Sequence, residues 1–113
     1  MIYNTTKNTQ IVKDHNICKS WYSKLKGLMF SKKNSKNLIF VFDNEKKIGL
    51  HMWFVFYPID VLLLDSDKKV VEIKERFRPF SWFNSKEKAK YVLELYSGTI
   101  NDKKIEIGDR LEF

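Results

Sequence analysis

Asp60 is the residue whose position in this sequence points most directly to chemistry. It follows Pro58 and Ile59, near the start of the second of two mostly apolar runs, residues 50–57 and 59–65, which are typical of two buried strands joined through a corner. A carboxylate in such surroundings needs hydrogen bonds or a cation, because otherwise burial raises its pKa and it becomes neutral. It could then act as a general acid or base. The alternative is structural: Asp60 accepts hydrogen bonds from backbone N–H groups and fixes the corner after Pro58.

Acid–base chemistry would require a second titrating group near Asp60, and the sequence offers His51 and Glu94. One hypothesis is therefore an enzyme that uses Asp60 with either residue on a small substrate. Glu94 and Asp109 could also form the carboxylate pair of a glycoside hydrolase if they faced each other across a cleft. Because Asp109 follows Gly108 just before a final strand, a turn in which its side chain bonds the local backbone is the commoner arrangement.

Metal and nucleophile chemistry have little support in the sequence. The two histidines, His15 and His51, and the one cysteine, Cys18, show no recurring spacing of metal ligands. His15 and Cys18 could form a base and a nucleophile, but no oxyanion-hole signature accompanies them. We predict no metal, no cofactor and no catalytic cysteine.

Residues 74–91 are the strongest candidate for a binding surface, with six basic residues against two acidic ones and aromatic side chains between them. Arginine forks can hold phosphates while aromatic faces stack on bases, each stacked base contributing about 1 to 3 kcal/mol. The same aromatics could stack on sugar rings, or simply cover the open end of a barrel. The candidate ligand-binding residues are His51, Trp53, Asp60, Arg76, Arg78, Phe80 and Trp82.

The net charge of +7 is unevenly distributed along the chain. Residues 1–37 hold eight lysines and one acidic residue, whereas the remainder holds 13 basic and 13 acidic side chains and is neutral. Such a cluster can attract phosphates or another polyanion. It can also serve only to keep the protein in solution. The partner class that the charge favours is single-stranded nucleic acid or another polyanion.

The elements that must position these residues are mostly short strands. A hydrophobic content of 43% with 4 Gly and 2 Pro in 113 residues predicts one compact domain, residues 1–113. Apolar residues recurring at helical spacing predict a short amphipathic helix over residues 17–28. Residues 85–90 could form a single helical turn, and residues 98–102 suit either a turn or a brief helix. We expect strands at residues 2–3, 10–12, 38–42, 50–57, 59–65, 70–74, 91–95 and 110–113.

These strands predict a mainly β, barrel-like and mostly antiparallel domain in which neighbours in sequence pair with each other. The polar residues 65–69 are typical of a hairpin turn, and residues 2–3 and 10–12 suit a second hairpin. Alternation over residues 91–95 places Val92 and Glu94 on one face of a strand and Leu93 and Leu95 on the other.

The compartment expected from the sequence is the cytoplasm. Cys18 is the single cysteine, so we expect no disulfide-linked partner. The first residues lack the apolar core of a signal peptide, and no apolar run approaches the roughly 18 residues that a membrane span needs.

Several blocks of the chain are similar to the domain-of-unknown-function family 192, in particular its archaeal branch. The matching blocks run from Gly27 to Phe30, from Ile39 to Phe42, from His51 to Val61 and from Tyr91 to Leu95, followed by Gly98 and Gly108-Asp109. The resemblance implies a β-rich, barrel-like fold and no established activity. One departure is that family members commonly carry a basic residue shortly before a Phe-Pro pair, where this chain has Val55, Phe56 and Tyr57-Pro58.

Three functional hypotheses follow from these observations. The first is a binding module for a polyanionic or sugar-like ligand, in which residues 77–84 accept the ligand with Trp53 or His51 nearby. The second is the acid–base enzyme built on Asp60. The third is a protein-interaction or stability factor that offers its aromatic segment as an anchor.

Overall fold

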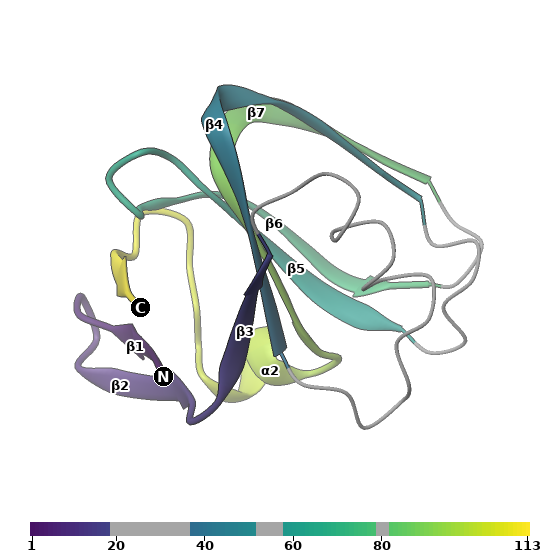
Figure 1. The fold of residues 1–113 in the computed structure, drawn as a ribbon. Coiled ribbons are helices and arrows are strands. Elements are labelled where there is room, and N and C mark those ends of the chain that lie inside the picture. The colour runs from purple at the N-terminus through teal and green to yellow at the C-terminus, as the bar shows by residue number, and fades with distance from the viewer. Residues whose placement is uncertain (19–36, 52–57, 79–81) are drawn as a thin grey trace.

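The computed structural model describes residues 1–18, 37–51, 58–78 and 82–113, which form two β-sheets (Figure 1). The smaller sheet has the order β2-β1-β8, and the larger sheet has the order β3-β4-β7-β5-β6. The strands are β1 (Ile2–Asn4), β2 (Thr9–Val12), β3 (His15–Cys18), β4 (Asn37–His51), β5 (Ile59–Leu64), β6 (Val70–Phe77), β7 (Trp82–Tyr96) and β8 (Leu111–Glu112). One short helix, α2 (Thr99–Asp102), follows β7.

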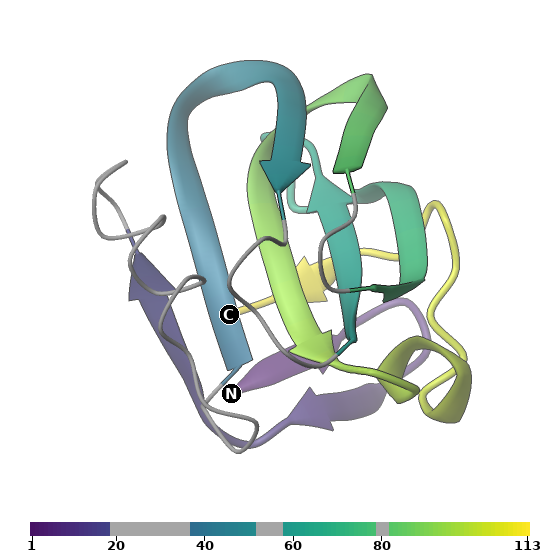
Figure 2. The same ribbon diagram turned by 90° about the vertical axis from the view of Figure 1, so that its right-hand side faces the viewer.

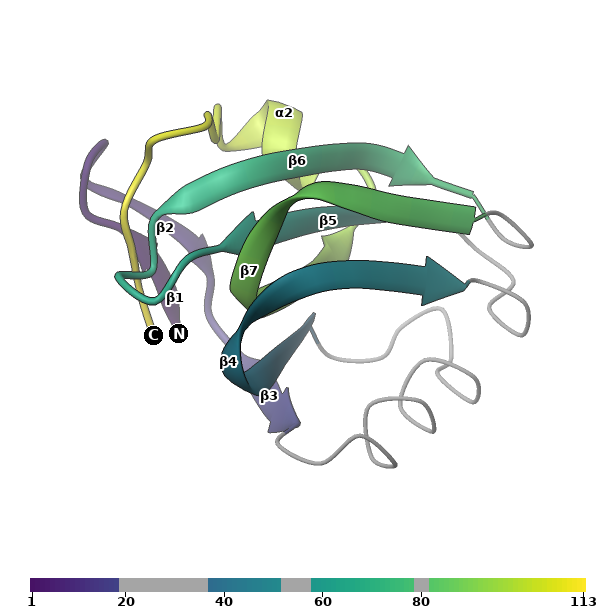
Figure 3. The same cartoon turned by 90° about the horizontal axis from the view of Figure 1, so that it is seen from above.

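The mainly β and mostly antiparallel prediction is confirmed, but the sheets do not close into a barrel. β3 pairs with β4 in parallel, whereas the other strand pairs are antiparallel. β3 and β6 remain as two separate edges of the larger sheet among the described strands. Seen from above, the larger sheet curves strongly, and the smaller sheet with both termini packs beside one end of it (Figure 3).

β5 is buried at every position because both faces of the larger sheet are covered. Ile59, Val61 and Leu63 pack into one apolar cluster with aromatic residues of β4 and β6, on the concave face. Leu62 and Leu64 pack into a second cluster that joins the larger sheet to the smaller one. This explains why residues 59–64 form a nearly continuous apolar run.

Both predicted hairpins are present. β1 pairs with β2, and β5 pairs with β6 through a turn closed by Asp65. The Asp65 Oδ1 atom accepts hydrogen bonds from the backbone N–H groups of Asp67 and Lys69. The helical turn predicted at residues 98–102 corresponds to α2, and Gly98 before it has a φ of 96°, which glycine adopts without steric cost.

The predicted sequential strand order is wrong beyond these hairpins. β7 lies between β4 and β5, so the two long strands β4 and β7 run side by side and bend together (Figures 1 and 2). β4 also continues through residues 43–47, where a strand end was expected. The side chains of residues 43–47 are exposed, and Lys46 and Lys47 pair with Ala89 and Lys88 of β7 after an irregularity in the register.

Two helix predictions are also corrected. Ile17 and Cys18, the first residues of the predicted helix 17–28, lie in β3 because they pair with Ile39 and Phe40 of β4; residues 19–28 lie outside the described part of the chain. The single turn predicted at 85–90 is part of β7. There the Ser85 hydroxyl accepts a hydrogen bond from the Ile48 N–H and donates one to the Glu87 carbonyl, so it serves the strand pair and not a helix cap.

Candidate functional site

Asp60 lies in β5 with no exposed surface, and its carboxylate is bonded to three backbone N–H groups. Oδ1 accepts from Arg76 at 3.0 Å, and Oδ2 accepts from Gly98 at 3.0 Å and Ile100 at 2.9 Å. The Arg76 residue forms a bulge in β6 with a φ of 50°, a conformation that costs a non-glycine residue about 1 kcal/mol or more. Asp60 therefore joins β5 to the bulge of β6 and to the turn that starts α2.

Asp60 and Glu94 point to opposite faces of the larger sheet. Asp60 is paired with Leu95, on the face of the cluster between the two sheets, whereas Glu94 is paired with Val61, on the concave face. An acid–base pair of Asp60 and Glu94 is therefore wrong. The side chain of His51 lies outside the described part of the structure, so the pairing of Asp60 with His51 stays a prediction.

Glu94 is a buried acid whose Oε1 atom has no hydrogen-bond partner in the described part of the chain. Only 5% of the residue is exposed, and burial raises the pKa of its carboxyl to about 8. The carboxyl is therefore mostly protonated at neutral pH.

Asp109 has the structural role that the turn prediction gave it. Its Oδ2 atom accepts hydrogen bonds from Asn4 Nδ2 at 2.8 Å, Lys7 Nζ at 3.0 Å and the Glu106 N–H at 3.0 Å. Burial alone would raise the pKa of Asp109, but these bonds stabilise the charged form and hold the pKa below its usual value. The side chain ties the first strand of the protein to the segment before the last.

A row of lysines lies on the ribbon formed by residues 46–51 of β4 and residues 82–90 of β7, which we call the basic ribbon. Lys47 is directly opposite Lys88 in the antiparallel pairing, and both are exposed. Paired positions place their Cβ atoms about 4.5–5.5 Å apart on one face of a sheet, and like charges there repel. Lys86 is exposed on the same strand as Lys88.

Two acids lie beside the basic ribbon, and the hydrogen bonds from Ser66, followed by the charges of Lys88 and Lys90, lower the pKa of one of them, Glu45. The carboxylate of Glu45 accepts hydrogen bonds from the backbone and hydroxyl of Ser66. Glu72 accepts from the backbone N–H groups of Lys86 and Glu87. Within the described residues, the ion pairs are those of Lys7 with Glu106 and Asp109, and none involves a lysine of the basic ribbon.

The other sequence candidates are only partly placed. Arg76 and Arg78 are exposed, which leaves their guanidinium groups accessible to a ligand. The backbones of His51 and Trp82 are paired at the end of the basic ribbon, so two residues far apart in sequence meet there. The side chains of these two residues, together with Trp53 and Phe80, lie outside the described part of the structure.

The described residues give no support to a metal site or to a nucleophile formed by His15 and Cys18. In the part of the chain that the structure describes, no three His, Cys, Asp or Glu residues gather as metal ligands. His15 Nδ1 lies 3.0 Å from the N-terminal nitrogen, and burial followed by that ammonium group lowers its pKa. The Cys18 side chain is outside the described part.

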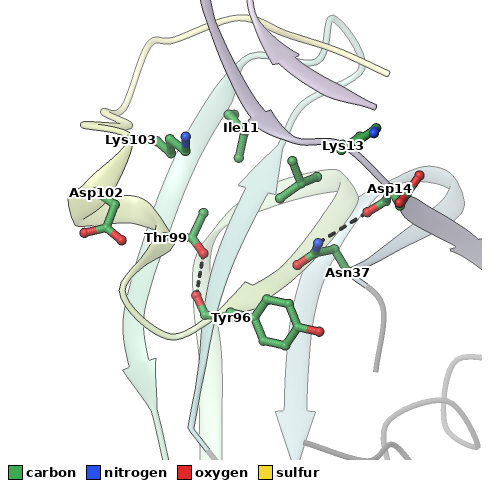
Figure 4. Close-up of a pocket in the computed structure, with 9 residues that line it drawn as sticks. Ile11, Lys13, Asp14, Asn37, Tyr96, Thr99, Asp102 and Lys103 are labelled. Atoms are coloured by element: carbon green, nitrogen blue, oxygen red, sulfur yellow. Dashed lines mark hydrogen bonds between the residues drawn. The ribbon is translucent and has the colours of Figure 1, made fainter. Parts of the chain in front are cut away.

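A pocket with a volume of about 440 Å³ opens where β2, the start of β4, the end of β7 and α2 meet (Figure 4). Ile11 and Val12 form its apolar part, and Tyr96 forms a wall. Asn37 Nδ2 donates to the Asp14 carbonyl at 3.3 Å, and the buried Asn37 Oδ1 has no hydrogen-bond partner among the residues that the structure describes. In Figure 4 this oxygen is turned away from Asp14, toward the side of Thr99 and Tyr96.

Sequence reasoning missed both the Lys47–Lys88 pair and this pocket. Each depends on β4 lying next to β7, a pairing between segments about forty residues apart that no local pattern specifies. A weaker signal was present: Lys86, Lys88 and Lys90 recur at every second residue, which is a strand period and not a helical one.

Together, these features define a small two-sheet β-protein with a basic ribbon, a polar pocket and structurally bonded internal carboxylates. The chain matches the domain-of-unknown-function family 192, described as "Uncharacterized ACR", over residues 2–113, and it belongs to that family. The family resemblance expected from the sequence is thereby confirmed. No helix in the described ranges is long and apolar enough to cross a membrane.

Archaeal relatives share most of the chain. It is 32% identical to a UPF0127 protein of Thermococcus sibiricus, over 100% of this chain and 74% of that protein. It is 35% identical to a UPF0127 protein of Pyrococcus furiosus, over 97% of this chain and 95% of that protein.

Two bacterial crystal structures share the fold. A protein of Sinorhizobium meliloti described as a "putative transcription regulator" has a TM-score of 0.80 and 28% identity, over 87% of this chain and 79% of that one. A protein of unknown function from Novosphingobium aromaticivorans has a TM-score of 0.80 and 21% identity, over 88% and 74% of the two chains.

Proposed function

We propose that this protein is a polyanion-binding module that contacts the phosphates of single-stranded nucleic acid through its basic ribbon. The observation that carries the proposal is the exposed pair of Lys47 and Lys88, which lie opposite each other and, among the described residues, have no carboxylate in ion-pair contact. A phosphate between two ammonium groups relieves their repulsion, whereas the free protein keeps it.

Other features of the same surface are consistent with this proposal. Lys86 is a further exposed lysine on β7 close in sequence to Lys88, so it adds positive charge to the same ribbon. The description of the Sinorhizobium meliloti protein as a regulator agrees with contact to nucleic acid.

The alternatives are weaker. Glu94 cannot be the acid–base partner of Asp60, because the two side chains are on opposite faces of the larger sheet. The carboxylate of Asp60 is also bonded to three backbone N–H groups. A protein-interaction role centred on Trp82 stays a prediction.

The proposal is tested by titrating the protein into labelled, mixed-sequence single-stranded RNA at low and high salt, with heparin as competitor. We expect micromolar binding that weakens steeply with salt. The double variant Lys47→Gln/Lys88→Gln should bind at least about tenfold more weakly, since two phosphate contacts are lost.

The matched control is Lys69→Gln/Lys104→Gln, which removes the same charge from two exposed positions outside the ribbon. It should bind nearly as well as the unaltered protein. No binding at low salt would refute the proposal. Equal weakening by both double variants would show that net charge alone, and not the ribbon, attracts the RNA.

A further inference from the structure

The pocket between β2, β4, β7 and α2 has a chemical character different from that of the basic ribbon. Its charged lining residues are Lys13, Asp14, Asp102 and Lys103, which balance to zero net charge. A polyanion therefore gains no net attraction there, because each lysine has an aspartate beside it in sequence. The balance suits a neutral ligand that both donates and accepts hydrogen bonds.

The side chain of Asn37 indicates that the pocket suits a ligand with a hydrogen-bond donor. Its Nδ2 atom donates to the Asp14 carbonyl, and this contact sets the amide orientation, because the reverse orientation would place two oxygens together. The oxygen Oδ1 is therefore an acceptor, and it is shielded from solvent and has no partner among the described residues. A buried acceptor without a partner costs free energy, and a ligand hydroxyl that reaches it would recover that cost.

The remaining lining provides a surface for the apolar face of a ring. Tyr96 is 41% exposed, and Ile11 and Val12 lie in the same pocket. The Thr99 hydroxyl donates to the Tyr96 carbonyl at 2.7 Å and so fixes the turn beside that residue (Figure 4). The volume of about 440 Å³ is within the range of small-molecule pockets.

We infer that this pocket is a binding site for a neutral, polyhydroxylated ligand of about the size of a monosaccharide. Ligand hydroxyls would bond Asn37 Oδ1 and the paired charged groups at the rim, while the C–H face of the ring packs against Tyr96. The inference does not depend on the basic ribbon, because no residue is common to the two sites.

The test uses the full chain and a panel of glucose, galactose and N-acetylglucosamine at millimolar concentrations, followed by NMR of the backbone and side-chain amides. We expect at least one sugar to shift the signals of Val12, Asn37 and Thr99 while those of Lys47 and Lys88 stay in place. Glucose 6-phosphate and alanine are included as an anionic and a zwitterionic comparator.

Two pairs of variants then locate the contacts. Asn37→Ala should weaken binding about three- to tenfold, since one hydrogen bond is lost, whereas Asn101→Ala on the exposed side of α2 should not. Tyr96→Leu should weaken binding, whereas Tyr96→Phe should retain it because the ring is kept. The amide spectrum of each variant reports whether it is folded.

Three outcomes would overturn the inference. One is that no sugar in the panel shifts the pocket signals of the unaltered protein. Another is that binding survives both Asn37→Ala and Tyr96→Leu in folded variants, which would place the sugar elsewhere. The third is that only the phosphorylated sugar or the amino acid binds, which would assign the pocket to a charged ligand.

Discussion

At the scale of single residues, three buried carboxyl groups in this protein behave differently because their partners differ. Asp60 has three backbone donors, Asp109 has a lysine and two amide donors, and Glu94 has an oxygen with no partner. The sequence offered the structural roles of Asp60 and Asp109 as alternatives, and the structure has both, whereas nothing in the sequence indicated the unbonded oxygen of Glu94. The role of each carboxyl depends on which backbone groups the fold brings to it.

Replacement of Asp60 tests its structural role. Asp60→Asn would place an amide N–H₂ against backbone donors, so we expect it to lower the free energy of unfolding by about 2 to 4 kcal/mol, and Asp60→Ala at least as much. Urea denaturation measures both effects. Asp67→Asn, at an exposed turn position, is the control and should change little. An Asp60→Asn variant of unchanged stability would contradict the structural account.

Glu94 predicts a pH dependence of opposite sign to that of most carboxyl groups. Its folded pKa of about 8 is above the usual 4.5, so the folded protein holds a proton that the unfolded chain releases. The stability contribution of the protonated group is fully present below about pH 4.5 and is lost as the pH rises to about 8. The effect of full ionisation is on the order of several kcal/mol.

Unfolding of Glu94→Gln at pH 5 and pH 8 checks this prediction. The variant should lose less stability between the two pH values than the unaltered protein, whatever its stability at pH 5. Glu112→Gln, at an exposed position of β8, should keep the original pH dependence. An identical pH dependence in Glu94→Gln would mean that Glu94 does not hold a proton in the folded protein.

At the scale of elements, the sequence patterns predicted the turns, hairpins and strand faces that short-range interactions determine. The hairpin closed by Asp65, the turn at α2 and the two faces of residues 91–95 all follow from short-range chemistry. The pairing of β4 with β7, the parallel β3 and the strand conformation of residues 85–90 could not be predicted in this way. In each case a distant strand supplies the hydrogen bonds that override local preference.

A substitution in the basic ribbon should change protein stability and RNA binding in opposite directions. Lys47→Glu would convert a repulsive cross-strand pair with Lys88 into an attractive one, so we expect the free energy of unfolding to rise by about 0.2 to 1 kcal/mol. RNA binding should fall at the same time. Urea denaturation and the RNA titration measure the two effects on the same sample. A less stable variant, or one that binds RNA normally, would be evidence against the ribbon as the binding surface.

At the scale of the whole molecule, the ends of the chain hold the smaller sheet together. β1 pairs with both β2 and β8, and Asn4 and Lys7 reach Asp109 near the last strand. This closure was not predictable from the short terminal strands alone, because neither contains a signal for the other. It places both termini on the same side of the larger sheet (Figure 2).

Acid should weaken this closure. The pKa of Asp109 lies below its usual value of 3.8, so its contribution to stability is present above that value and is lost as the pH falls through the folded pKa. We expect Asp109→Asn to reduce amide-exchange protection in β1 and β8 at neutral pH and to remove much of the acid-induced loss there. Equal protection in the variant and the unaltered protein would contradict a closing role for Asp109.

The most direct measurement of the central claim is the slope of log Kobs against log salt concentration for single-stranded RNA. If Lys47 and Lys88 each contact a phosphate, their double replacement by Gln should make the slope shallower by about 1.4, since each contact with a single strand contributes about 0.7. The Lys69→Gln/Lys104→Gln control should leave the slope nearly unchanged. Unchanged slopes in both double variants, with binding intact, would show that the basic ribbon does not hold the RNA.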